Sequence, residues 1–178
     1  MRFLLTIAVL AAVAALGIAA DGEFKLSGEN TKIGFTGTKK DGKHTGTFPK
    51  LTGTITAPGG NVTSGTINVT IDMAGVESDD PRLTEHLKGA DFFDVKTNPK
   101  ASFVSTKIES KDGQFTVTGD FTLNGKKKSI SFPATIGLKG GQYALSADFK
   151  IDRTDYGIKY GQGKIDNAVA ITIALTAK

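Results

Sequence analysis

The chain has 178 residues, with 22 basic and 18 acidic side chains, no cysteine and no tryptophan. The lack of cysteine excludes a disulfide framework and a thiolate metal site. The small positive excess is scattered, and its densest run, residues 126–128, has no aromatic neighbours of the kind that nucleic-acid binding favours.

The first 20 residues resemble a secretory signal peptide. Arg2 precedes an apolar run over residues 3–18, and small residues close the segment at Gly17, Ala19 and Ala20. This pattern predicts cleavage after Ala19 or Ala20, an exported protein that is periplasmic or secreted, and one mature domain over residues 21–178. A retained membrane anchor is the weaker alternative, because the apolar core is short for a span.

From Phe24 onward the apolar residues recur with the strand period of two. Strong alternation covers residues 67–73, 114–123, 130–136, 143–151 and 169–175, and weaker strands cover residues 33–35, 47–56 and 101–108. Turn sequences separate several of them, at residues 58–61, 111–113, 124–125 and 139–141. The pattern predicts an all-β fold of about eight antiparallel strands, closed into a barrel that removes exposed edges.

Four glycines lie within or at the start of these strands, at positions 46, 53, 65 and 119. Glycine inside a strand marks a bend, a bulge or a close backbone approach, so these positions favour a strongly curved sheet. For Gly65 a simple strand start after a turn is an equally good interpretation.

One stretch interrupts the strands and predicts a short helix over about residues 79–89. Asp79 and Asp80 are good N-cap residues, Pro81 suits the first helical position, and Gly89 ends the segment. The turn that follows, Asp91-Phe92-Phe93-Asp94, places two adjacent aromatic rings in a connection. We therefore expect an aromatic lid over the open end of the barrel.

A barrel of this size is either filled by its own side chains or encloses one small ligand, and periodicity leaves both open. The lack of tryptophan and the many inward alanines and glycines favour a cavity. Its apolar wall would suit a long apolar chain. The predicted lining residues are Phe35, Phe48, Val69, Ile71, Phe92, Phe93, Phe103, Val117, Phe121, Phe132, Phe149 and Ile171.

Residues suited to catalysis or metal binding are few. His44 and His86 are the only histidines and lie far apart in the sequence, and the chain lacks a complete dinucleotide fingerprint or a nucleophile elbow. Arg153, between Asp152 and Asp155, predicts a fixed ion-pair and hydrogen-bond network at the barrel rim, in which it holds a loop closed; the alternative is that it faces a polar ligand head. His86, Arg153 and Tyr156 form the candidate polar rim.

Several blocks, in this order, resemble the YceI-like family of polyisoprenoid-binding, lipocalin-like periplasmic proteins. They are residues 82–94 (RLTEHLKGADFFD), 99–106 (PKASFVST), 118–125 (TGDFTLNG), 132–134 (FPA) and 151–157 (IDRTDYG). The resemblance implies an eight-stranded lipocalin-like barrel with a helix near one end and an elongated apolar tunnel for an isoprenoid quinone, a polyprenyl chain or a similar lipid. One difference lies in the first hairpin, where residues 30–39 (NTKIGFTGTK) lack two histidines that are frequent in the family.

These observations predict an exported, non-enzymatic carrier or scavenger of a long apolar lipid such as a quinone, a polyprenyl chain or a fatty acid. The alternatives are an enzyme acting on such a lipid in the same tunnel and a β-domain without a ligand. The expected partner is the lipid itself, with transient membrane contact for loading and no nucleic acid; no metal or other cofactor is expected, and a dimer is left open.

Overall fold

The computed structural model describes residues 22–178, so the predicted signal peptide lies outside the described residues. Eleven strands form one antiparallel sheet in the order β1-β4-β5-β7-β8-β9-β10-β11-β2-β3-β6. Their bounds are β1 (Gly22–Ser27), β2 (Thr31–Lys39), β3 (Gly42–Thr47), β4 (Leu51–Ala57), β5 (Thr66–Asp72), β6 (Glu77–Ser78), β7 (Lys100–Lys111), β8 (Gln114–Leu123), β9 (Lys126–Lys139), β10 (Gln142–Asp152) and β11 (Ala168–Ala177).

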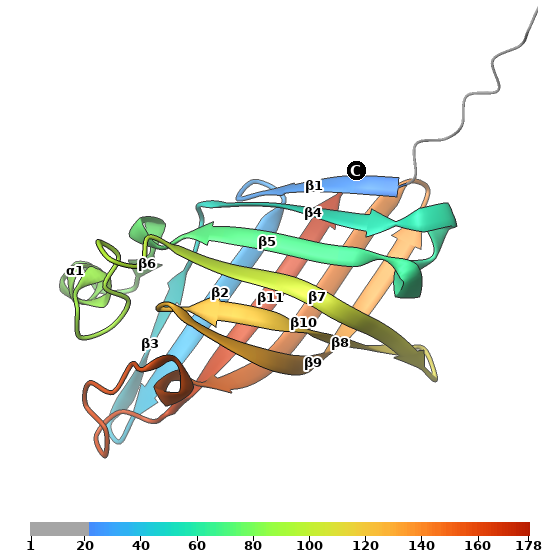
Figure 1. Ribbon diagram of the computed structural model, residues 1–178. Helices are drawn as coiled ribbons and strands as arrows, with labels where there is room; N and C mark the ends of the chain where they lie inside the picture. Colours follow the sequence, from blue (N-terminus) through green and yellow to red (C-terminus); the bar gives the residue numbers. More distant parts are fainter. Residues whose placement is uncertain (1–21) are drawn as a thin grey trace, which may run out of the picture.

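The sheet curls on itself into a barrel-like shell. In Figure 1 strands β4, β5 and β7 lie across the front, and β2, β10 and β11 run behind them at a steep angle. The inward side chains of both layers form one core cluster. The all-β class, the antiparallel barrel-like sheet and, within residues 22–178, the single short α-helix are thus confirmed.

The described part of the chain forms eleven strands rather than about eight. Two of the additional strands are hard to recognise in sequence: β1 has only two inward apolar residues, Phe24 and Leu26, and β6 has only two residues in all. The segment around residues 31–47 is rich in glycine, threonine and lysine, yet it forms the β2–β3 hairpin because β2 pairs with β11 along its other edge. Long-range pairing here overrides weak local propensity.

Three predicted hairpin turns are confirmed between β7 and β8, β8 and β9, and β9 and β10. Both central residues of each turn have positive φ, as a type I′ turn requires: Asp112 and Gly113 at 52° and 81°, Asn124 and Gly125 at 51° and 70°, Gly140 and Gly141 at 60° and 72°. The connection between β4 and β5 instead folds into two single 3₁₀ turns, Pro58–Gly60 and Val62–Ser64.

Two strand glycines make room for aromatic rings. Gly46 pairs with Phe35, and a Cβ atom on Gly46 would overlap that ring. Gly119 lies opposite Ser105, next to a bulge in β7, and a Cβ atom there would meet the ring of Phe103. Each ring therefore occupies the space that a side chain on the glycine would need, and the bulge adds the local curvature that strand glycines predict.

The helix α1 (Pro81–Lys88) lies within the predicted range. Asp80 is its N-cap, because its carboxylate accepts hydrogen bonds from the N–H groups of Arg82 and Leu83 at 2.8 and 3.4 Å. Beyond the helix, the N–H of Phe93 donates to the carbonyl of Leu87 at 3.0 Å, which folds the aromatic turn back against the helix. We call residues 79–95 the capping segment, and it covers one end of the shell (Figure 1).

Two further 3₁₀ turns, Met73–Gly75 and Arg153–Tyr156, complete the structure. Across residues 22–178, no helix combines the length and apolarity needed to cross a membrane.

Candidate functional site

An apolar cavity of about 190 Å³ lies inside the curled sheet, and its wall exposes no polar atoms. Seven of the strands contribute to it: β2, β5, β7, β8, β9, β10 and β11. The capping segment closes one end with Leu87, Phe92 and Phe93. A compartment with such a wall accommodates hydrocarbon and offers no partner to a polar group.

The structure brings together all but one of the predicted lining residues. Those that line the cavity are Phe35, Phe48, Val69, Ile71, Phe92, Phe93, Phe103, Phe121, Phe132, Phe149 and Ile171. For the residues in strands, period-two alternation predicts this placement, because alternate side chains of a strand point to the same face. Phe48, Phe92 and Phe93 lie in connections, where alternation does not apply. That these residues bind a ligand stays a prediction.

The prediction that Val117 lines the cavity is wrong. Its side chain is 0 % exposed but is not part of the cavity wall. It pairs with Ile108, which also lies in the buried core away from the cavity wall, and with Phe132, which does line the cavity. The interior is therefore packed at one place and hollow at another, and strand periodicity carries no information on this difference.

A chain of aromatic contacts crosses the mouth of the cavity. Phe35 contacts Phe48, and Phe48 contacts the edge of Phe93, with ring centroids 5.3 and 5.9 Å apart. Phe92 contacts His86 at 4.9 Å and Tyr160 at 5.3 Å. The predicted lid residues thus lie across the opening; whether they move stays a prediction.

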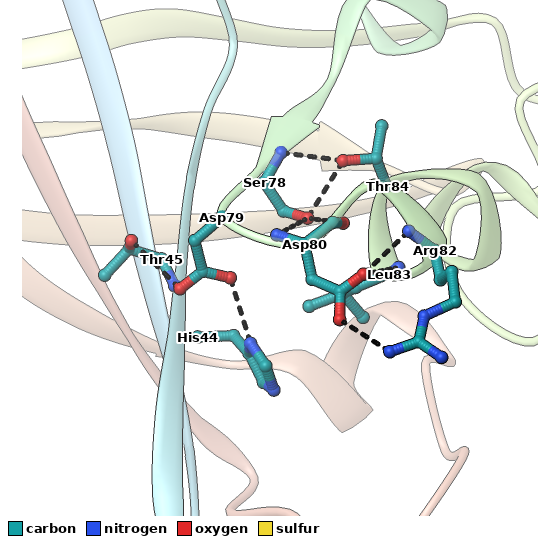
Figure 2. Close-up of polar contacts among 8 residues, drawn as sticks. All are labelled: His44, Thr45, Ser78, Asp79, Asp80, Arg82, Leu83 and Thr84. Carbon is teal, nitrogen blue, oxygen red and sulfur yellow. Dashed lines mark hydrogen bonds and ion pairs between the residues drawn. The ribbon is translucent and has the colours of Figure 1, made fainter.

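The capping segment is anchored at its start by Asp79, as Figure 2 shows. The carboxylate of Asp79 accepts hydrogen bonds from the N–H of Thr45 and from Nδ1 of His44, each at 2.9 Å. The hydrogen bond from the Thr45 N–H, followed by that from His44, lowers the pKa of Asp79 from its ordinary value. Asp79 is therefore a link between β3 and the capping segment, whereas the N-cap role belongs to Asp80.

The second histidine also has an acidic partner. Nε2 of His86 lies 3.0 Å from Oδ2 of Asp91, and its ring contacts Tyr160 with centroids 4.8 Å apart. Both histidines thus contact carboxylates of the capping segment, and neither is a merely solvated surface residue. The described residues contain no group of three or more His, Cys, Asp or Glu side chains able to hold a metal ion.

Arg153 holds a loop through backbone carbonyls. Its side chain is 4 % exposed and donates to the carbonyls of Ile158, Tyr160, Ile165 and Asp166 at 2.8 to 3.1 Å. The prediction that hydrogen bonds of Arg153 hold a loop closed is confirmed, whereas the predicted ion pairs with Asp152 and Asp155 are wrong: Asp152 caps the turn at Thr154, and Asp155 faces Lys128 at 3.9 Å. Arg153 contributes to the cavity wall without exposing a polar atom there.

The three residues of the candidate polar rim do not come together. His86 lies half-exposed in the capping segment and Arg153 is buried beneath its loop. Tyr156 is buried against Phe121, with centroids 5.2 Å apart, and burial, with a smaller effect from Asp155, raises its pKa to about 12. Tyr156 does not line the cavity.

Sequence reasoning missed part of the mouth. Ile158 and Ile165 line the cavity, and Tyr160 covers Phe92 from outside. These residues lie in a glycine-rich connection without strand or helix periodicity. The arginine that positions the connection was visible in the sequence, but its acceptors are backbone carbonyls, which leave no signal there.

A curled antiparallel sheet around an apolar cavity, with a short helix and an aromatic turn across its mouth, defines a protein of the lipocalin-like class. Comparison with known families places it more narrowly. The sequence model of the YceI-like domain matches residues 24–177, so the chain belongs to the YceI-like family.

Relatives agree with this assignment. Protein YceI of Escherichia coli O157:H7 is 32% identical over 136 residues, which cover 73% of this chain and 71% of the relative, and Protein YceI of Salmonella arizonae is 30% identical over the same length. The crystal structure of Burkholderia cenocepacia BcnA has a TM-score of 0.77 at 25% identity, covering 83% of this chain and 96% of BcnA. A polyisoprenoid-binding domain from Saccharophagus degradans implicated in plant cell wall breakdown has a TM-score of 0.69, covering 88% and 98% of the two chains; at 14% identity it shows the fold alone.

Proposed function

We propose that this protein is a non-enzymatic carrier or scavenger that holds the apolar chain of an isoprenoid quinone, a polyprenyl lipid or a fatty-acid-like molecule in its cavity. The observation that carries the proposal is the wall, in which aromatic and aliphatic side chains from seven strands expose no polar atom. Burial of a hydrocarbon chain in such a wall is favourable by about 25 cal/mol per Å² of apolar surface removed from water.

The description of the Saccharophagus degradans domain as polyisoprenoid-binding supports the lipid class. The placement of polar groups supports a non-enzymatic role. Among the described residues that line the cavity, Arg153 is the one with an ionisable side chain, and its hydrogen bonds go to backbone carbonyls of its own loop. A general acid or base has to reach the reacting atoms, and the described wall offers none.

Native mass spectrometry of the protein purified gently from its own host tests the proposal. We expect a co-purifying apolar adduct that organic solvent extracts intact. An empty cavity, together with no binding of a fluorescent quinone or fatty-acid analogue, would instead identify a β-domain without a ligand. Conversion of the added lipid to a product would identify an enzyme.

We also propose that the protein works outside the cytoplasm, after removal of residues 1–20. The support is the charge, apolar run and small-residue ending of that segment. Sequencing of the mature N-terminus from the native host should give Ala20 or Asp21. Recovery of intact Met1 from the membrane fraction would contradict the proposal and favour an anchor.

A further inference from the structure

The loop between β10 and β11 faces both the cavity and solvent. Ile158 and Ile165 line the cavity, while Lys159, Tyr160 and Lys164 of the same loop are exposed. Arg153 fixes this arrangement, because it binds the carbonyls of Ile158, Tyr160 and Ile165. A surface that contacts the outside of this loop is therefore separated from the cavity only by the loop itself.

The same loop is joined to the tip of the β2–β3 hairpin. The N–H of Asp166 donates to the carbonyl of Thr38 at 2.9 Å, the hydroxyl of Thr38 donates to the carboxylate of Asp166, and Lys39 forms a bridge with Ile165. Figure 1 shows the two segments side by side at the end of the shell that carries α1. We call this joint surface, residues 38–43 and 157–166, the basic rim.

The basic rim has a positive charge without acidic partners. Its lysines are all exposed, and none lies within 4.0 Å of a carboxylate oxygen in residues 22–178. The rim contains only two acids, Asp41 and Asp166, and Asp166 is engaged by Thr38. The lysines are Lys39, Lys40, Lys43, Lys159 and Lys164.

An exposed aromatic ring lies among these charges. Tyr160 is 46 % exposed, and in the described chain Val104, at 44 %, is the only other large apolar side chain so open to solvent. The ring of Tyr160 rests on His86 and Phe92 at the mouth of the cavity. A tyrosine flanked by lysines matches the interfacial region of a bilayer, where the ring lies at headgroup level and the ammonium groups meet lipid phosphates.

We propose that the basic rim docks on an anionic lipid bilayer and brings the mouth of the cavity to the membrane surface. Charge complementarity favours this partner. Anionic headgroups create a negative surface potential that attracts scattered lysines without requiring a fixed geometry. The docking goes beyond the proposed function, and binding to a bilayer can be measured whether or not a lipid enters the cavity.

Because the chain has no tryptophan, Tyr160→Trp places a single fluorescent reporter on the rim, and Val104→Trp on the outer face of β7 is the matched control. We expect the emission of Tyr160→Trp to shift to shorter wavelength with vesicles of phosphatidylglycerol and phosphatidylethanolamine in equal parts. It should not shift with phosphatidylcholine vesicles or at high salt. The Val104→Trp variant should not respond to either vesicle.

Lys159→Gln with Lys164→Gln tests the charge directly by co-sedimentation of the protein, without any reporter, with the same vesicles. Each lysine near an anionic surface strengthens binding by about fivefold, so the double variant should bind roughly 25-fold more weakly. The control pair, Lys111→Gln with Lys139→Gln, removes two exposed lysines beside the β7–β8 and β9–β10 turns and should bind like the wild type.

Equal weakening by both lysine pairs, an equal shift of both reporters, or no co-sedimentation of the wild type would overturn the proposal. If the basic rim instead recognises a soluble protein, the wild type should not co-sediment with the vesicles. Docking on vesicles without uptake of a quinone analogue would support the docking proposal and contradict the proposed lipid-binding function. Uptake of the analogue without docking would support the lipid-binding function and contradict the docking proposal.

Discussion

At the scale of single residues, Arg153 shows how a buried charge is stabilised without a counter-ion. Its guanidinium replaces water with four carbonyl oxygens of one loop. The fixed fork of N–H groups suits this arrangement, whereas the compact ammonium of lysine cannot reach all four acceptors. The loop that lines the cavity mouth therefore depends on a single side chain.

Arg153→Lys should leave at least one carbonyl without a donor, at a cost of about 1–3 kcal/mol in the free energy of unfolding for each buried acceptor. Arg153→Met removes all donors and should cost more. Urea unfolding measures both. Arg82→Lys, whose side chain is 95 % exposed, is the control and should be neutral. Equal stability of the wild type and Arg153→Met would contradict the role of the carbonyl network.

Asp79 links β3 to the capping segment through charge-assisted hydrogen bonds. Because the folded state lowers the pKa of Asp79, its ionised form is preferred when the chain is folded. The stabilising contribution is therefore complete above the ordinary value of 3.8 and is lost as the pH falls through the lower folded value.

We expect Asp79→Asn to lower the free energy of unfolding at neutral pH, and the difference from the wild type to shrink as the pH falls below about 3.8. Thermal or urea unfolding across the acidic range measures this. The control is Asp148→Asn, since Asp148 is exposed and takes part in none of the ion pairs of the described residues. A pH-independent difference would show that the contribution of Asp79 does not come from its charge.

At the scale of elements, the capping segment contains two adjacent aromatic residues in different surroundings. Phe93 packs inward on Phe48, while Phe92 contacts His86 and Tyr160, which are themselves partly open to solvent. Both rings are buried and both line the cavity. Their contacts nevertheless assign Phe93 to the core and Phe92 to the outer seam of the mouth.

The two alanine variants should therefore differ. Phe93→Ala removes a core ring and should cost about 3–5 kcal/mol in stability. Phe92→Ala should cost less and should speed the release of a bound fluorescent fatty acid, because loss of a cover acts mainly on the dissociation rate. Thermal unfolding and release kinetics, followed on the same samples, separate the effects. An unchanged release rate from folded Phe92→Ala would mean that the aromatic turn is part of the core and does not act as a lid.

At the scale of the whole molecule, the interior is divided between a hollow region and a packed one. Phe121 and Val117 belong to the same strand, yet Phe121 lines the cavity and Val117 does not. The division lets one part of the shell supply stability while another remains open to a ligand. Substitutions in the two regions should therefore have different consequences.

Phe121→Trp should obstruct the cavity and weaken lipid binding, at a stability cost of about 1–3 kcal/mol from overpacking. Val117→Ala should cost roughly 2–3 kcal/mol, because it empties a fully buried site, while leaving lipid binding intact. Unfolding and binding of a quinone analogue, measured on both variants, test the division. Undiminished binding by folded Phe121→Trp would mean that the ligand does not reach that position.

The sequence by itself determined the features that depend on local chemistry. Period-two alternation identifies β5 and β8 to β11 and their inner faces because side chains of a strand alternate strictly. Asn124-Gly125 and Gly140-Gly141 identify turns because those residues tolerate positive φ. Asp80 and Pro81 identify the start of α1 through capping, and the YceI-like family is recognisable from conspicuous blocks such as Asp-Phe-Phe-Asp.

Only the tertiary structure decided how these elements meet. The register between β2 and β11, the separation of a hollow region from the packed site of Val117, and the carbonyl partners of Arg153 each depend on atoms far apart in the sequence. Backbone carbonyls are common to every residue, so their use as acceptors leaves no pattern to read. The basic rim could not be predicted because its two segments lie more than a hundred residues apart in the sequence. Only in the folded structure does the pairing of Lys39 with Ile165 join them.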